Sequence, residues 1–147
     1  MNVLSKNIEL ETKKQFEIID LTKQVEAVLK ESKIDKGLVS IYSTHTTAGI
    51  RINHFEQLLL QDIMKLMYRV APIENNYAHD LFEIRNEMQS GERSNGHAHV
   101  KAFLLGSSET IPVSDQKMLL GYRQSIFFVE LDGPRKKRRC VVTVIGE

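Results

Sequence analysis

The sequence predicts a compact α+β domain with a mixed, largely antiparallel sheet and helices packed on it. Segments with strand-like patterns lie near both ends of the chain, and segments with helical spacing lie between them. No internal repeat, low-complexity tract or Pro/Gly-rich linker divides the 147 residues. A chain of this length ordinarily forms one domain, so we expect a single domain over residues 1–147.

The composition is typical of a soluble globular protein, with 41% hydrophobic and 27% charged residues and a net charge of +1. A charge so close to zero predicts attraction to neither nucleic acid nor membrane surfaces. The first residues lack the basic and apolar regions of a signal peptide, and no apolar run approaches the length of a membrane helix. Cys140 has no second cysteine to pair with. We therefore expect a cytoplasmic protein.

The N-terminal part predicts two strands and a helix. Asn7 to Thr12 alternates apolar and polar residues, and Phe16 to Ile19 follows as a second strand. The short Lys13-Lys14 connection suggests a hairpin between them. Asp20 is a plausible N-cap for an amphipathic helix that continues to about Ser32.

The middle of the chain predicts two extended pieces and a long helix. Leu38 to Tyr42 and Ala48 to Ile52 are extended, and Phe55 to Val70 keeps helical spacing until Ala71-Pro72 stops it. Ile73 to Ser94 is a polar connection, with a short helix suggested around Leu81 to Met88. Such long connections are usually functional or mobile.

The C-terminal part begins with an ambiguous segment. Val100 to Leu105 is too short and apolar for its period to separate helix from strand. Three extended stretches follow it, at Thr110 to Val113, Ser125 to Leu131 and Arg139 to Ile145.

Two histidines, His97 and His99, stand two residues apart beside an Asn-Gly turn signal. In an extended segment both imidazoles would point to one face and could hold one metal or one phosphate, whereas in a helix they would diverge. A catalytic zinc ion commonly takes three protein ligands, which His79 or His45 would complete. The alternative is one buried and one exposed histidine without a ligand.

His45 lies among hydroxyl residues at the end of a predicted strand, and His79 precedes an aspartate in the polar connection. A histidine in such a place can act as a general base or a proton donor. The alternatives are an ordinary turn around His45 and a solvated loop around His79. Small residues in Asn95-Gly96 and Gly106-Ser107-Ser108 form turns that could present N–H and hydroxyl groups to a phosphate.

A basic run extends from Arg135 to Arg139, after an Asp-Gly-Pro turn. Its shortness and its position between two predicted strands favour a solvated turn over an RNA-binding surface. Arg135, beside the Gly-Pro, is the member expected to reach an anion through its guanidinium fork.

Taken together, these segments resemble the YjbQ-like family, named the secondary thiamine-phosphate synthase family. The resemblance extends over essentially the whole chain. The matching segments, in order, are Thr44-His45-Thr46-Thr47-Ala48-Gly49, Ile52-Asn53, Tyr77-Ala78-His79-Asp80, Asn95 to Lys101, Leu105 to Val113, Leu120-Gly121, Gln124, Glu130 to Arg135, and Gly146-Glu147.

The resemblance implies a compact α+β domain that assembles as a homotrimer. It also implies an activity, the displacement of pyrophosphate from an aminopyrimidine by a thiazole phosphate, with a divalent metal ion such as Mg or Zn. The alternative is a module that binds or senses an anionic metabolite without chemistry. The residues expected to serve are His45, His79 and His99 in catalysis; Asn53, Asn95, Ser107, Ser108, Gln124 and Arg135 in substrate binding; and His79, His97 and His99 as metal ligands. His97 matches fewer relatives than His99, and Glu56 and Asp62 follow the first histidine motif.

The chain departs from the family pattern at three places. It has His54 after Asn53 where the family has Asn-Glu, and His54 is expected either to add a ligand or to cap the following helix. It has Asp115-Gln116 in place of Asp-Gly, so that turn must be built differently. It has Tyr122-Arg123 where the family has Thr-Trp, so an aromatic ring is lost at Arg123, and Tyr122 either replaces that ring or does not.

Overall fold

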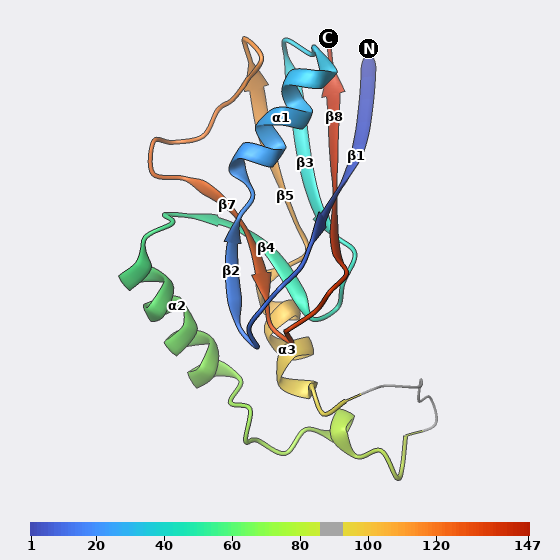
Figure 1. The fold of residues 1–147 in the computed structure, drawn as a ribbon, viewed down its shortest axis with the longest axis vertical. Coiled ribbons are helices and arrows are strands. Elements are labelled where there is room, and N and C mark those ends of the chain that lie inside the picture. Colours follow the sequence, from blue (N-terminus) through green and yellow to red (C-terminus); the bar gives the residue numbers. More distant parts are fainter. Residues whose placement is uncertain (86–92) are drawn as a thin grey trace.

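The computed structural model of the protein describes residues 1–85 and 93–147 and contains two sheets with helices around them (Figure 1). The sheets have the strand orders β1-β8-β3-β5-β6 and β2-β7-β4. In chain order the elements are β1 (Asn2–Leu10), β2 (Glu17–Asp20), α1 (Thr22–Ser32), β3 (Gly37–Ser43), β4 (Ala48–Asn53), α2 (Gln57–Val70), the 3-10 helix η1 (Ala78–Asp80), α3 (Gly96–Leu105), β5 (Ser108–Ser114), β6 (Lys117–Met118), β7 (Ser125–Glu130) and β8 (Arg138–Gly146).

Strand pairing in the described residues is antiparallel throughout, so the α+β class is confirmed and the sheet is divided in two. β8 lies between β1 and β3 in the larger sheet, and β7 lies between β2 and β4 in the smaller one. Since β7 and β8 belong to different sheets, the seven residues between them, Leu131 to Lys137, link the two sheets. Two polar segments contact this region: the loop that follows β3 and the segment that precedes α3.

The core divides into two clusters of buried apolar residues. The larger one is covered by α1 (Figure 1), and it includes the buried Val25, Val28 and Leu29 of that helix. The smaller one lies between β7, α2 and α3 and contains Phe127, with Phe55 packed edge-on against it at 5.7 Å between ring centroids. The second cluster is what positions α3 against the sheet.

The predicted hairpin between the first two strands is wrong. β1 pairs with β8 and β2 pairs with β7, in different sheets. The residues between them bond instead to the β7–β8 connection: the Thr12 N–H donates to Arg135 O at 2.8 Å, and the Gly133 N–H donates to Gln15 O at 3.0 Å. Alternation of polar and apolar residues identifies strands, but it does not identify their partners.

The ambiguous segment before Gly106 is helical, since α3 begins at Gly96 and runs to Leu105. Helix α1 confirms the amphipathic helix that was predicted to continue to about Ser32. Asp20 stands one residue before its N-cap and accepts hydrogen bonds from the Thr22 N–H and hydroxyl at 2.9 and 2.6 Å. The short helix suggested from Leu81 is absent as far as Arg85, and its remaining residues lie outside the described range.

The Asp115-Gln116 departure is accommodated by a two-residue turn between β5 and β6. Ser114 pairs with Lys117, and both turn residues have left-handed φ angles, of 53° for Asp115 and 58° for Gln116. This is the conformation that Asp-Gly favours in a tight hairpin. Glutamine occupies the second position at a steric cost that glycine would avoid.

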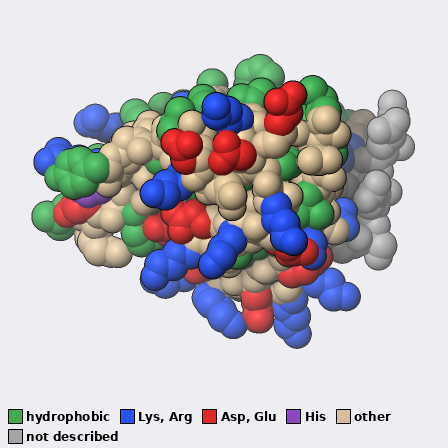
Figure 2. Space-filling model, turned by 90° about the horizontal axis from the view of Figure 1, so that it is seen from above, with side chains coloured by type: hydrophobic (Ala, Val, Ile, Leu, Met, Phe, Trp, Pro, Cys, Tyr) green, Lys and Arg blue, Asp and Glu red, His purple; other side chains and the backbone are tan. Residues whose placement is uncertain are grey.

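Charges of both signs are interspersed on the face at the end of the molecule that carries the termini (Figure 2). This distribution agrees with a net charge of +1. Among the helices of the described residues, none is both long and apolar enough to cross a membrane.

Candidate functional site

His45 lies in the loop between β3 and β4, and its ring is oriented by strand β8. The Arg139 backbone N–H donates to His45 Nε2 at 2.8 Å. A nitrogen that accepts a hydrogen bond carries no proton, so the neutral ring bears its proton on Nδ1. The backbone of the loop also forms the hydroxyl-bonded turn that the sequence suggested, because the His45 N–H donates to Ser43 Oγ at 3.3 Å.

The surroundings keep His45 neutral. Burial lowers the pKa of this imidazole below its ordinary value of 6.5, and the charges of Arg138, Arg139 and Arg135 lower it further, while Glu130 opposes them. Protonation would also place a hydrogen on Nε2, where the Arg139 N–H already points. His45 is therefore a hydrogen-bond donor through Nδ1 rather than a base through Nε2.

A buried ion pair holds the His45 loop against the sheets. Glu130 is fully buried and Arg138 is 5% exposed. Arg138 Nε donates to Glu130 Oε2 at 2.6 Å, and a terminal nitrogen of Arg138 donates to Oε1. The same guanidinium donates to Thr47 Oγ1 at 2.9 Å, two residues after His45. The Thr12 hydroxyl donates to Glu130 Oε2 at 3.0 Å, so the pair also contacts the connection from β1 to β2.

A second network orients His79. The amide nitrogen of buried Asn95 donates to Asp132 Oδ2 at 2.8 Å, so the amide oxygen is the acceptor that faces His79 Nε2 at 3.2 Å. Because an amide oxygen only accepts, His79 Nε2 carries a proton. The chain Asp132–Asn95–His79 thereby connects the β7–β8 connection, the start of α3 and η1.

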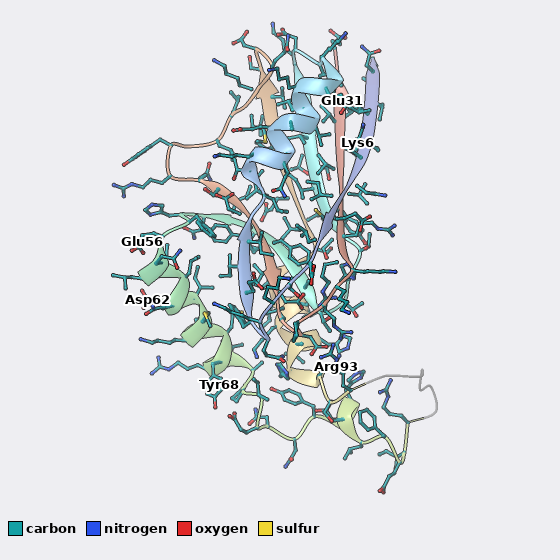
Figure 3. The ribbon with its side chains drawn as sticks, in the orientation of Figure 1. Lys6, Glu31, Glu56, Asp62, Tyr68 and Arg93 are labelled. Atoms are coloured by element: carbon teal, nitrogen blue, oxygen red, sulfur yellow. The ribbon has the colours of Figure 1, made fainter. Side chains whose placement is uncertain are left out.

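Asp132 is held as a carboxylate although it is buried. Burial raises the pKa of this group, but hydrogen bonds from Asn95 and Arg135 and the charges of Arg93 and Arg135 lower it by more, so the net shift is downward. Arg135 donates to Asp132 Oδ2 at 2.7 Å. Arg93 lies just before α3, with its Nε 3.9 Å from the same oxygen (Figure 3).

The start of α3 places His99 beside His79. The Gly96 N–H donates to Asp80 Oδ1 at 3.0 Å, which joins the helix to η1. A Cβ on Gly96 would lie 2.5 Å from Tyr77 Cβ, so only glycine permits this close approach. The rings of His79 and His99 then meet edge to face, with centroids 4.6 Å apart.

His99 and His45 line one cavity of about 350 Å³, which lies between the His45 loop and α3. We call this cavity the His45–His99 cleft. Its other lining residues supply two hydroxyl groups, small side chains and one exposed aromatic ring: Thr46, Ala48, Ala102, Phe103, Gly106 and Ser107. None of the described residues in this lining is acidic. Its volume is within the range of small-molecule sites.

His97 lies on the other side of α3. Two residues along a helix turn a side chain by about 200°, so His97 and His99 point in different directions, as predicted for a helical segment. His97 is 4% exposed, and its Nδ1 lies 2.9 Å from Lys101 Nζ. Within one described chain, the predicted ligands His79, His97 and His99 do not converge, and the described residues contain no group of three or more His, Cys, Asp or Glu that could hold a metal ion. The divalent ion stays a prediction.

Of the other residues predicted to bind substrate, some lie in the cleft and others lie outside it. Ser107 is in the cleft, whereas Ser108 begins β5 and is exposed. Arg135 is bound to Asp132 by its guanidinium. Asn53 and Gln124 lie at the far end of the smaller sheet, where Asn53 accepts from the His54 N–H and Gln124 accepts from the Gly121 N–H at 2.8 and 2.7 Å.

Glu56 stands directly before α2 and Asp62 lies on α2 (Figure 3), and neither residue lines the cleft. Glu56 is the N-cap, and its side chain accepts from the Leu59 N–H at 2.6 Å. His54 precedes this cap and is not itself the capping residue.

Asp132 and Phe103 were not predicted. Asp132 stands in an Asp-Gly-Pro-Arg turn, and aspartate is so common in turns that the sequence shows no sign of a functional role. Its burial and its hydrogen bond from Asn95 are seen only in the structure. Phe103 belongs to an apolar run, and its 86% exposure is visible only in three dimensions.

A sequence model of the family described as "UPF0047 protein YjbQ-like" matches residues 6–147. A UPF0047 protein of Methanothermobacter thermautotrophicus is 39% identical over all of this chain and 95% of its own length. One from Archaeoglobus fulgidus is 41% identical over 91% of this chain and 96% of its own length. A crystal structure of a protein of unknown function from Sulfolobus solfataricus superposes with a TM-score of 0.90 at 35% identity, covering 99% of this chain and 98% of that one.

Proposed function

We propose that this chain, which belongs to the YjbQ-like UPF0047 family, binds the phosphate groups of a small phosphorylated molecule in its His45–His99 cleft. The observation that carries the proposal is the set of donors around the cleft. His45 has its proton on Nδ1, and Thr46 and Ser107 contribute hydroxyls. Because the described lining residues carry no negative charge, none of them repels an anion.

The reaction that fits this site is transfer with loss of pyrophosphate. A thiazole phosphate attacks an aminopyrimidine, a carbon–nitrogen bond forms, and the carbon–oxygen bond to pyrophosphate breaks. Negative charge accumulates on the departing pyrophosphate, and donors already aimed at that position stabilise it without reorganisation. In this scheme His45 donates through Nδ1, and the Asp132–Asn95–His79 chain orients the imidazole pair of His79 and His99.

Self-association as a homotrimer forms part of the same proposal. Large apolar side chains are exposed on α2 and α3, among them Leu58, Leu66, Phe103 and Leu104. Exposed apolar surface of this kind is typical of a protein–protein contact. Phe103 also lines the cleft. A neighbouring subunit packed on α3 would therefore cover the cleft and add its own residues to the lining.

Turnover of the thiazole phosphate and aminopyrimidine pyrophosphate tests the enzymatic form. We expect His45→Ala, His79→Ala and His99→Ala to abolish product while each variant keeps its fold and its oligomeric state. Folded variants that turn over as fast as the parent protein would refute the assignment. Metal analysis of the same preparations tests the divalent ion.

A binding module is the second candidate, because the donor set requires only an anion. In that case phosphate compounds raise the free energy of unfolding by RT ln(1 + [L]/Kd), and the melting temperature rises with it, but no product forms. A thermal-shift screen with phosphate esters, followed by product analysis of each hit, separates the two functions.

A further inference from the structure

A second cavity, of about 320 Å³, lies where α2 and α3 meet the connection from β1 to β2. Its walls are mostly apolar. They are formed by Phe16, Met64, Met67, Ile73 and Leu131, with Gln15, Lys65, Tyr68, His97 and Lys101 also in contact. We call it the Lys101 cavity. It shares no lining residue with the His45–His99 cleft, which lies on the opposite side of α3.

Lys101 is 4% exposed, and among the described residues its ammonium group makes one hydrogen bond, to His97 Nδ1 at 2.9 Å. An ammonium has three N–H donors, so two are left without an acceptor in the part of the chain that the structure describes. No ion pair of Lys101 with a described carboxylate lies within contact distance. Glu74 acts on it only from a distance, and the Glu74 carboxylate accepts instead from the Tyr68 hydroxyl at 2.5 Å.

The contrast with Arg138 shows what Lys101 lacks. Arg138 is also almost completely buried, but its guanidinium is bonded to the fully buried Glu130. A buried charge without an opposite charge is costly, and the cost falls when an anion supplies the missing partner. Burial accordingly lowers the pKa of Lys101 below its usual range.

We propose that the Lys101 cavity binds a small amphipathic monoanion, with a carboxylate on Lys101 Nζ and an apolar body between Phe16, Met64 and Met67. The carboxylate completes the donors of the ammonium, and the neutral His97 holds that ammonium in place through Nδ1. The apolar walls favour an alkyl or aromatic body over a sugar or a nucleotide.

Hexanoate is a suitable probe, and the methionine methyl groups report its position in the unmodified protein. In a protein with 13C-labelled methionine methyls, we expect saturable shifts of Met64 and Met67 on addition of hexanoate. Met118 lines a different cavity, beside residues of α1, and should not move. Hexan-1-ol and hexylamine have the same chain without the carboxylate, and we expect each to bind about tenfold more weakly or worse.

Two lysines of the cavity provide matched variants. Lys101→Met removes the buried ammonium at nearly constant size, and Lys65→Met removes an exposed one from the same lining. We expect Lys101→Met to lose the preference for hexanoate over hexan-1-ol and Lys65→Met to keep it. Three results would overturn the proposal: no saturable shift in the parent protein, equal binding of acid and alcohol, or equal losses in the two variants.

Discussion

The buried pair of Arg138 and Glu130 allows a prediction in which stability and the titration of a site residue change together. Arg138→Met removes the cation and leaves Glu130 fully buried with hydrogen bonds from Thr12 and the Asp132 N–H but no charge partner. Breaking one side of a buried pair costs about 3–5 kcal/mol. For a domain of this size, we expect the melting temperature to fall by roughly 6–20 °C.

The magnitude can be attributed to the pair by a double-mutant cycle in urea. Glu130→Gln alone leaves the Arg138 cation uncompensated, so it is also strongly destabilising. Combined with Arg138→Met, it removes the orphaned carboxylate, and the double variant should be less destabilised than the sum of the two singles, by about 1 kcal/mol or more. Additive losses would show that the two side chains do not stabilise one another.

Substitution of Arg138 should also change the pKa of His45. Burial is the largest cause of the low pKa of this imidazole, and Arg138 is the next. Arg138→Met should therefore raise the pKa, and Arg138→Lys, which retains the charge, should leave it low. Proton NMR of the imidazole carbon-bound hydrogens gives both values. A pKa that is unchanged in Arg138→Met, while it remains folded, would refute this account of His45 as a neutral donor.

Three further outcomes are expected. Gln116→Gly should stabilise the protein by about 1 kcal/mol in chemical denaturation, because the left-handed φ of 58° suits glycine; a loss of stability would contradict the turn. Gly96→Ala should destabilise it by about 1–3 kcal/mol, since its Cβ would meet Tyr77, and an equally stable variant would contradict that contact. The pKa values of His45 and His97 lie below 6.5, so between those values and 6.5 the unfolded chain binds more protons, and stability should fall as pH drops through that window. A melting temperature that is flat or rises from pH 7 to pH 5 would oppose the assignment.

The strands and the long helix follow from the sequence because each has a local signal. Alternation and β-branched content identify β1 and β3, and Pro72 marks the end of α2. The partners of β1 and β2 had no such signal. Their pairing is fixed by the connection around Gly133, whose contacts with the chain near Lys14 exist only in the folded state.

The site was predicted in part for the same reason. His45, His79 and His99 stood out as polar residues beside turn signals, and the structure brings His79 against His99 and His45 into the same cleft as His99. Whether His97 joined them depended on the helical or extended state of one short segment, which the period could not decide. Asp132 was not predicted, because an aspartate at this position is explained by a turn as well as by a functional role.

The pair His97 and His99 provides the most direct test of the central claim, that phosphate groups bind in the His45–His99 cleft. The two imidazoles are two residues apart on one helix and face different cavities. Titration calorimetry with inorganic pyrophosphate should give binding to the parent protein, retention within about threefold in His97→Gln and a loss of about tenfold or more in His99→Gln. Equal affinities in the two variants, or a larger loss in His97→Gln, would contradict the claim.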